Sequence, residues 1–274
     1  MIIIDPDLIA SFLAPAASLN RPLLGWRNVV TAGNVTATSA LAAYPASNLG
    51  NPSTASDMEW RASPLASPPA DIYLTVALGT PTSLDYIGLA RHNLGSSGAL
   101  VSVEHLDGTW QELIGPTGLS DDKAAMFQWA PGSYSSIRLR IQPGSAAPRI
   151  AVMYCGLLTK LPRNIYVGHT PVLFGRRTNV YTGRSEHGDY LGRVVLNRTL
   201  ETDVSMSNCP PEYFRSDIHP FFVAAEEIPF FFAWRPYAFP QEIGYCWLTG
   251  DGNMSNQLPN GFVQFAFKLG AIAE

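Results

Sequence analysis

The sequence predicts an all-β protein, and three observations support this prediction. The chain has 23 Gly and 22 Pro among its 274 residues, and only 15% of its residues are charged, against about 25% in an ordinary soluble domain. Short runs such as Ile72–Leu78 and Phe262–Leu269 alternate apolar and polar residues with the period of a half-buried strand. No long segment has helical periodicity. Many turns, many aromatic residues and few charges also predict that partners cover much of the surface.

Composition divides the chain into three parts. Residues 1–24 are apolar and contain three Pro, which predicts an irregular N-terminal arm. Residues 25–160 are expected to form a β-sandwich, and the turn-like Lys160–Arg163 marks its end. Residues 161–274 are expected to form a second, mixed β domain that assembles into oligomers and holds one short helix, Glu212–Ala225. The strands expected in the sandwich are Ile72–Leu78, Ser83–Leu89, Ala99–Glu104, Trp110–Leu113, Ser136–Ile141 and Ile150–Leu157. Those expected in the second domain are Tyr181–Arg184, Gly192–Arg198, Leu200–Met206, Pro229–Trp234, Tyr245–Leu248 and Phe262–Leu269.

The charges argue against several classes of partner. The net charge of −4 offers no basic face for nucleic acid, so we expect none to bind. No run of 18 uncharged apolar residues occurs, so no membrane span is expected. Asp5 and Asp7 stand where a signal peptide needs positive charge, which favours synthesis in a cytoplasm. The cysteines, Cys155, Cys209 and Cys246, form no C-x-x-C pair, so we expect buried thiols rather than a zinc site or a disulfide scaffold.

The second domain carries the most unusual composition. Residues 161–200 hold six Arg and two acidic residues, whereas residues 201–274 hold three basic and nine acidic residues. Twelve of the 30 aromatic residues lie between Tyr213 and Trp247. The two charge clusters meet either inside the fold or between subunits, and the aromatic strand is covered either by a neighbouring subunit or by a helix of its own domain. The residues predicted at a subunit interface are Arg176, Arg177, Arg184, Arg193, Arg198, Phe230, Phe231, Phe232 and Trp234.

No catalytic residues are predicted, and we expect a protein that is not an enzyme. The five His have no metal-ligand spacing, and the sequence contains neither a nucleophile elbow nor a P-loop. The densest titratable cluster, Glu186–Asp189, is expected to be a solvated loop. The acidic residues leave a glycan-active enzyme as a third alternative, because a glycosidase needs only two opposed carboxylates across a cleft.

Five segments in the first part resemble a known fold. They are Ala46-Ser47-Asn48-Leu49 with Glu59-Trp60-Arg61, the strand Ile72–Gly79, the strand Ser83–Ala90 with His92-Asn93, the hairpin Val103–Trp110 and the strand Ile137–Ile141. In this order they resemble the galactose-binding-like jelly-roll β-sandwich of the discoidin or coagulation-factor C-terminal type. The resemblance implies a sandwich that binds glycans or other partners with the loops at one end.

The same resemblance implies two sites. Arg91, His92 and Asn93 lie where the family's loops contribute to carbohydrate binding. The alternative, which the residues favour, is a hydrogen-bonded turn. Asn48, Asn51, Asp57 and Glu59 are candidate ligands of a structural calcium ion, since hard cations take several oxygens from one loop. The alternative is a loop closed by hydrogen bonds from side chains to backbone. No other cofactor is expected.

The second part resembles structural proteins of the tail tips of long-tailed bacteriophages, of the distal-tail type. The features are Phe174-Gly175-Arg176-Arg177, the strand Arg193–Arg198 and the Pro- and Phe-rich block Pro229–Pro240. The order, sandwich first, departs from the usual distal tail protein. The resemblance implies a non-enzymatic virion component of the tail tip or baseplate, assembled in the host cytoplasm as a trimeric or hexameric ring. Its partners would be tail proteins such as the tail tube and hub. The alternative is a carbohydrate-binding module that mediates adsorption to a host-surface glycan.

Overall fold

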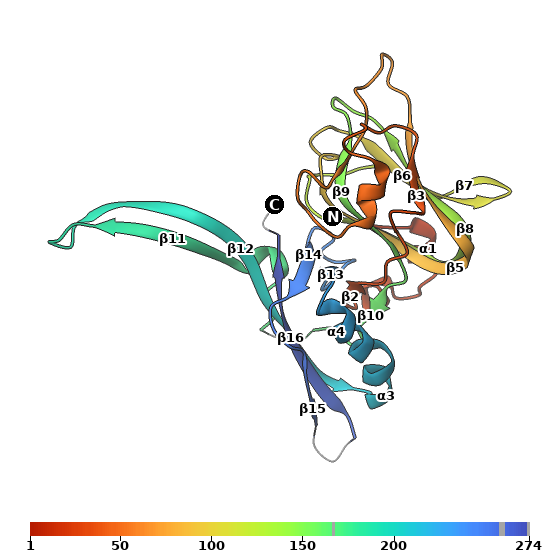
Figure 1. The fold of residues 1–274 in the computed structure, drawn as a ribbon. Helices are drawn as coiled ribbons and strands as arrows, with labels where there is room; N and C mark the ends of the chain where they lie inside the picture. The colour runs from red at the N-terminus through yellow and green to blue at the C-terminus, as the bar shows by residue number, and fades with distance from the viewer. Residues whose placement is uncertain (166–167, 258–260, 273–274) are drawn as a thin grey trace. The chain divides into compact units, whose positions relative to one another are not determined.

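The computed structural model describes residues 1–165, 168–257 and 261–272, and it is mostly β (Figure 1). The chain divides into two compact units. The first unit contains Met1–Asn164 and Ile228–Tyr245, and the second contains Ile165–Glu227 and the described residues from Cys246 to Ile272. Within the described ranges, no helix is long and apolar enough to cross a membrane.

The first unit is built on an eight-stranded sheet that is antiparallel except for one strand. Its order is β4 (Trp60–Arg61), β9 (Arg149–Gly156), β5 (Ile72–His92), β8 (Ala125–Gln142), β6 (Leu100–Asp107) and β7 (Thr109–Gly118). In addition, β3 (Val35–Ala37) pairs with β5, and β1 (Ile2–Ile4) pairs in parallel with β8.

The two longest strands fold this sheet around one core. The register between β5 and β8 shifts between Ala77 and Thr82 and again between Leu84 and Tyr86. Such irregularities bend a strand, and they let its two halves belong to opposite layers. Buried residues from both halves, Leu74 and Leu89 among them, belong to one hydrophobic core. The first unit therefore contains the β-sandwich that the sequence predicts.

The N-terminal 24 residues do not form the irregular arm that the sequence predicts. They contain β1, the short helices α1 (Pro6–Ala10) and α2 (Pro15–Ser18), and the start of β2 (Leu23–Gly25). The prolines do not prevent this, because Pro6 and Pro15 each stand in the first turn of a helix, where their missing N–H is not needed. Strand β2 pairs with β10 (Thr159–Lys160) and with β13 (Phe230–Ala233).

Strand β13 also changes the predicted domain boundary. The break at Asn164 lies close to the predicted one at 160, but Ile228–Tyr245 belongs to the first unit rather than to the second. The physical reason is packing: Phe231 lies opposite Gly25 in the β13–β2 pair, and its ring contacts the rings of Tyr154 and Tyr245.

The second unit combines a sheet with a short helical layer. Its strands are the end of β14 (Ile243–Leu248), β16 (Val263–Ala271), β12 (Tyr190–Cys209) and β11 (Arg176–Arg184), in that order, and β15 (Asn253–Asn256) also pairs with β16. The helical segment comprises α3 (Pro211–Tyr213), the π-helical turn η3 (Phe214–Ile218) and α4 (His219–Ala225). It confirms the helix predicted at Glu212–Ala225, and β16 confirms the alternating strand at Phe262–Leu269. Rings of Phe221 and Phe222 pack on those of Phe265 and Phe267.

Strands β11 and β12 form a long hairpin that we call the arm, Arg176–Arg198 (Figure 1). Residues 200–209 of β12 pair with β16, whereas residues 190–200 pair with β11. Among the described residues, β11 pairs with no other strand. The two segments Gly192–Arg198 and Leu200–Met206, predicted as separate strands, are one continuous strand.

Candidate functional site

A polar pocket lies at one end of the first unit's sheet, where three strands end or begin. Its volume is about 270 Å³, and its lining includes Glu59, Arg91, His92, Asp122 and Arg149. Glu59 comes immediately before β4, Arg91 and His92 are the last two residues of β5, and Arg149 is the first residue of β9. The neighbouring strands therefore bring together residues up to 90 positions apart in the sequence.

The turn after β5 is held by hydrogen bonds of Asn93. Its Nδ2 donates to the carbonyl of Ala147 at 3.0 Å, and its Oδ1 accepts from the backbone N–H of Arg149 at 2.9 Å. Arg91 occupies the left-handed region at φ 55°, a strained conformation for a residue with a side chain. Asn93 thus fixes the backbone that presents Arg91 and Arg149.

Glu59 is the buried anion of the pocket. Its carboxylate accepts from Arg61 Nε at 2.6 Å, and a guanidinium nitrogen of Arg149 lies 3.9 Å away. The guanidinium of Arg61 also stacks over the ring of Tyr44, with its carbon 3.9 Å from the ring centroid. Arg149 is half exposed, so its other nitrogens remain accessible to solvent.

His92 is neutral in this environment. Burial lowers its pKa to about 4, an effect that nearby Asp122 opposes. Its Nδ1 accepts from the N–H of Leu94 at 3.3 Å, which leaves the proton on Nε2. Nε2 makes no hydrogen bond of ordinary geometry with a described residue. Because Nε2 is buried, His92 shapes the pocket rather than presenting a donor to it. The pocket therefore offers donors from Arg beside carboxylate acceptors.

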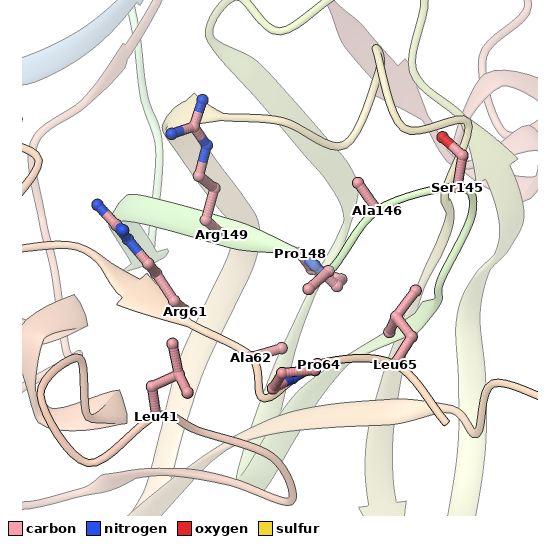
Figure 2. Close-up of a pocket in the computed structure, with 10 residues that line it drawn as sticks. Leu41, Arg61, Ala62, Pro64, Leu65, Ser145, Ala146, Pro148 and Arg149 are labelled. Carbon is pink, nitrogen blue, oxygen red and sulfur yellow. The ribbon is translucent and has the colours of Figure 1, made fainter. Parts of the chain in front are cut away.

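An apolar groove adjoins the polar pocket and shares Arg149 with it. The groove has a volume of about 410 Å³, and Leu41, Pro64, Leu65 and Pro148 are among its lining residues. Figure 2 shows Arg61 and Arg149 pointing the same way at one end of the groove, with Ser145 and Leu65 at the other.

The structure brings together only part of the predicted carbohydrate site. Arg91 and His92 both line the polar pocket, whereas the side chain of Asn93 is hydrogen-bonded to backbone groups of Ala147 and Arg149. Glu59, Asp122 and Arg149 complete the lining, and sequence reasoning did not assign them to a carbohydrate site. The sequence holds only a weak indication that Arg149 belongs to this site. It directly precedes a predicted strand, but the sequence does not show that this strand pairs with β4.

The structure gives no support to the predicted calcium site at Asn48, Asn51, Asp57 and Glu59. Asn48 donates through Nδ2 to the carbonyl of Glu59 at 3.1 Å, and Asn51 Oδ1 accepts from the N–H of Ser53 at 2.9 Å. The Glu59 carboxylate is engaged by arginines, which compete with a cation. The loop is therefore closed by hydrogen bonds, as in the alternative interpretation. Within the part of the chain that the structure describes, no group of three or more His, Cys, Asp or Glu side chains is arranged to hold a metal.

The arm is the second candidate site, because it exposes apolar side chains along its length. Six of them are 44–68% exposed: Tyr181, Tyr190, Leu191, Val194, Val195 and Leu196. Tyr181 lies directly opposite Val194, and Val180 lies opposite Val195, so both faces of the ribbon carry apolar residues. Isolated surface hydrophobic residues are normal, but a contiguous set of this kind marks an interaction site.

The predicted interface residues fall into two groups. Arg176, Arg184, Arg193 and Arg198 are exposed on the arm, and Arg177 pairs with Glu201 at 2.7 Å. The predicted role of the aromatic residues is wrong for Phe230, Phe231 and Phe232, because each is fully buried within the first unit. Trp234 is partly buried, and its Nε1 donates to the carboxylate of Glu242 while its ring stacks on Phe239.

Two buried groups of the first unit give opposite pH dependences. Burial raises the pKa of Asp85 to about 6, although its Oδ1 accepts from the N–H of Leu158 at 2.7 Å. Asp85 therefore binds a proton more readily when folded, and it stabilises the fold increasingly as the pH falls from 6 to its ordinary pKa of 3.8. His92 does the reverse: its pKa is 6.5 when unfolded and about 4 when folded, so its contribution to stability falls as the pH falls through this window.

We therefore expect Asp85→Asn to make the protein more sensitive to acid. In the unmodified chain Asp85 and His92 change the free energy of unfolding in opposite directions as the pH falls. Each change is about 3 kcal/mol at most, so the two largely cancel between pH 6.5 and 4. Removing Asp85 leaves the His92 effect unopposed, and hydrogen exchange of peptides from β5 across this window measures the stability of the first unit. The double variant with His92→Gln is the control and should lose the added slope. An Asp85→Asn protein with the wild-type pH profile would contradict the assignment.

Comparisons with known proteins find similarity in structure only. No protein-family model and no curated protein matches the sequence. Chitosan-binding module 1 from a Paenibacillus sp. IK-5 chitosanase/glucanase is similar with a TM-score of 0.39 and 17% identity, covering 47% of this chain and 98% of that one. A Clostridium perfringens module in complex with GalNAc-β-1,3-galactose has a TM-score of 0.38 and 13% identity over 46% and 96% of the two chains. A pectin-binding module has a TM-score of 0.37 and 17% identity over 47% and 90%. Each of these similarities covers about half of this chain.

Proposed function

We propose that this chain is a non-enzymatic assembly protein that associates with further copies through its arm. The observation that carries the proposal is the exposure of apolar side chains on both faces of a two-stranded ribbon. A two-stranded hairpin is only marginally stable in water, since neither of its faces has a covering layer. Burial of Leu191 and Leu196 in an interface would remove their apolar surface from water and stabilise the hairpin.

The charges and edges of the arm support the same proposal. Five Arg and two acidic residues lie between positions 176 and 198. Arg is the cation suited to interfaces, because its planar group forms forked hydrogen bonds and is weakly hydrated. Within the arm, from Arg176 to Arg184 and from Tyr190 to Arg198, the outer edges of β11 and β12 also carry backbone groups that no described strand pairs. Such edges are templates for pairing with another chain.

The finer form of this proposal is a tail-tip component of a long-tailed phage. In that form the copies close into a trimeric or hexameric ring, contact tail tube and hub proteins, and display the sandwich at the virion surface. It rests on the sequence resemblance of Phe174–Arg177 and Pro229–Pro240 together with the exposed arm. In a closed ring each copy would insert its arm into one neighbour and contact the arm of another, so the apolar surface of every arm would be buried.

Native mass across a dilution series tests the proposal on the unmodified full-length chain. We expect a discrete multiple of the 29.7 kDa subunit that dissociates on dilution. A ring gives one closed species, whereas an open chain of copies gives a ladder of masses. A monomer at every concentration and salt level would reject association through the arm.

The polar pocket favours a second candidate function, carbohydrate binding. Sugar hydroxyls both donate and accept hydrogen bonds, and the pocket offers donors from Arg91 and Arg149 beside acceptors from Glu59 and Asp122. The adjoining groove supplies apolar surface for a sugar ring. In the assembled protein such a pocket would let the sandwich adsorb to a glycan.

We expect Arg149→Ala to weaken sugar binding by tenfold or more. A charged hydrogen bond contributes about 1.5–3 kcal/mol, and 1.4 kcal/mol corresponds to a factor of ten. An array of neutral, amino and acidic oligosaccharides identifies the probe, and titration of the variant with that probe measures the loss. Arg176→Ala, an exposed arginine on the arm, is the matched control. Equal binding by both variants, or no sugar bound by the unmodified protein, would remove this candidate.

A further inference from the structure

The second unit contains a groove whose lining is apolar at the base and acidic at the rim. Its volume is about 560 Å³, and Phe214, Phe222, Leu248 and Met254 are among its apolar lining residues. Val223 and Met254 are about half exposed, so the groove presents apolar surface to solvent. Its acidic members, Glu226 and Asp251, are exposed.

The ring of Phe222 packs tightly against the chain at Gly252, which gives the groove a firm wall. A Cβ on Gly252 would lie 2.7 Å from three atoms of that ring. Phe222 also contacts the rings of Phe265 and Phe267 on β16. The groove is therefore shaped by packed aromatic rings rather than by mobile side chains, as expected of a pocket for an anchoring residue.

The arm of the same copy does not reach this groove. Met254 pairs with Phe265, which pairs with Met206 on β12. The arm tip at Tyr190 lies 16 residues before Met206 on the same strand, which corresponds to roughly 50 Å of extended chain. In Figure 1 the tip and β15 lie toward opposite ends of β12.

The arm tip and the groove match in chemistry. Tyr190 and Leu191 are each 68% exposed and stand between Arg184 and Arg193. Residues 211–227, which form one side of the groove, hold four acidic residues and one Arg. The loop between the two strands also holds Glu186 and Asp189, but the arm as a whole carries five Arg against these two acidic residues. An apolar pair on an arm of net positive charge thus matches a groove that has an apolar base and a carboxylate rim.

We infer that the tip of one copy's arm docks in the groove of a second copy. Tyr190 and Leu191 fill the apolar base, while Arg184 and Arg193 pair with Glu226 and Asp251. The inference rests on the proposed assembly function and names the surface that receives the arm. Two copies that exchange tips about a two-fold axis form a reciprocal dimer, and repetition of the contact around another axis produces a larger ring when the rotation closes.

Cysteine cross-linking between copies tests the contact. We expect Tyr190→Cys mixed with Met254→Cys to give a covalent dimer with a short bifunctional maleimide, whereas neither variant alone does so. The three native thiols are buried, and burial raises the pKa of each, so they do not compete. Tyr190→Cys mixed with Leu13→Cys, a fully exposed position of the first unit, is the control.

A charge-reversal pair gives a second measurement that does not depend on cross-linking geometry. We expect Asp251→Lys to weaken association tenfold or more at low salt, and Arg193→Glu in the same chain to restore part of it. Glu212→Lys, on the same helical segment but outside the groove lining, is the matched control. An oligomer of unchanged mass and affinity in the Asp251→Lys protein, with no specific cross-link, would overturn the docking site while leaving the assembly function standing. A monomeric unmodified protein would instead overturn the assembly function.

Discussion

Replacing Phe231 by alanine is expected to destabilise the first unit by about 3–5 kcal/mol, the usual cost of deleting a buried aromatic ring. The ring is fully buried, packs edge-on against Tyr154 at a centroid distance of 5.5 Å, and contacts the tilted ring of Tyr245 at 5.0 Å. It also lies directly over Gly88 of β5, where an added Cβ would come within 2.6–3.0 Å of three ring atoms. Hydrogen exchange of peptides from β5 measures the loss, since a single unfolding free energy is not defined for a chain of two units.

Gly88→Ala is the matched test of this contact. The added methyl would collide with the Phe231 ring, and we expect a loss of about 1–3 kcal/mol from overpacking. In a Phe231→Leu background the same substitution should cost much less, because the ring atoms it meets are gone. Gly79→Ala on the same strand is the control, since no atom lies within 4 Å of a Cβ there. Equal costs of Gly88→Ala in both backgrounds would show that β13 does not pack as described.

This contact also explains why the sequence alone misplaced the domain boundary. Phe230, Phe231 and Phe232 follow one another, and a strand with large residues on both faces needs cover on both. Composition cannot say whether that cover is another subunit or another part of the chain. Here it comes in part from Gly88, whose missing side chain makes room for the Phe231 ring, and from Gly25, which lies beside the Cβ of Phe231. A pairing between residues about 200 positions apart leaves no local signal.

Local patterns predicted the strands better than their connections. The alternation in Ile72–Leu78 is confirmed, and Ser83–Leu89 is a strand as predicted, although its residues from Leu84 on are all buried. Gly79-Thr80-Pro81 between the two segments is a bend in one strand rather than a turn between two. The first half of β8 was not predicted, although it holds the buried Trp129. Its residues are buried on both faces, and such a segment lacks the period-two pattern that identifies half-buried strands.

The candidate sites were predictable to the extent that their residues are neighbours in sequence. Arg91 and His92 end one strand, and together they indicated a binding loop. Their companions Asp122 and Arg149 arrive through the pairing of β5 with its neighbours, which no spacing rule encodes. On the arm, composition alone identifies the cluster of arginines. Its apolar residues have the sequence pattern of an ordinary half-buried strand, and only the structure shows that they are exposed.

The Leu191→Glu, Leu196→Glu double variant is expected to abolish assembly at concentrations where the unmodified protein is fully associated. Burying a leucine side chain contributes about 1.5–3 kcal/mol, so loss of two such contacts raises the dissociation constant by roughly 100-fold or more. Both residues are more than 60% exposed in the single chain, so the substitutions cost the fold little. Native mass across a dilution series measures the shift.

The control for this variant is Leu13→Glu, which adds a charge at a fully exposed leucine outside the arm. We expect its dissociation constant to equal that of the unmodified protein. Salt separates the two contributions of the arm: screening weakens the arginine contacts, whereas apolar burial persists. If assembly depends on both, the Arg193→Glu protein should lose association mostly at low salt and the double leucine variant at every salt concentration. Assembly that survives the leucine substitutions would place the interface elsewhere on the chain and leave the exposure of the arm without a function.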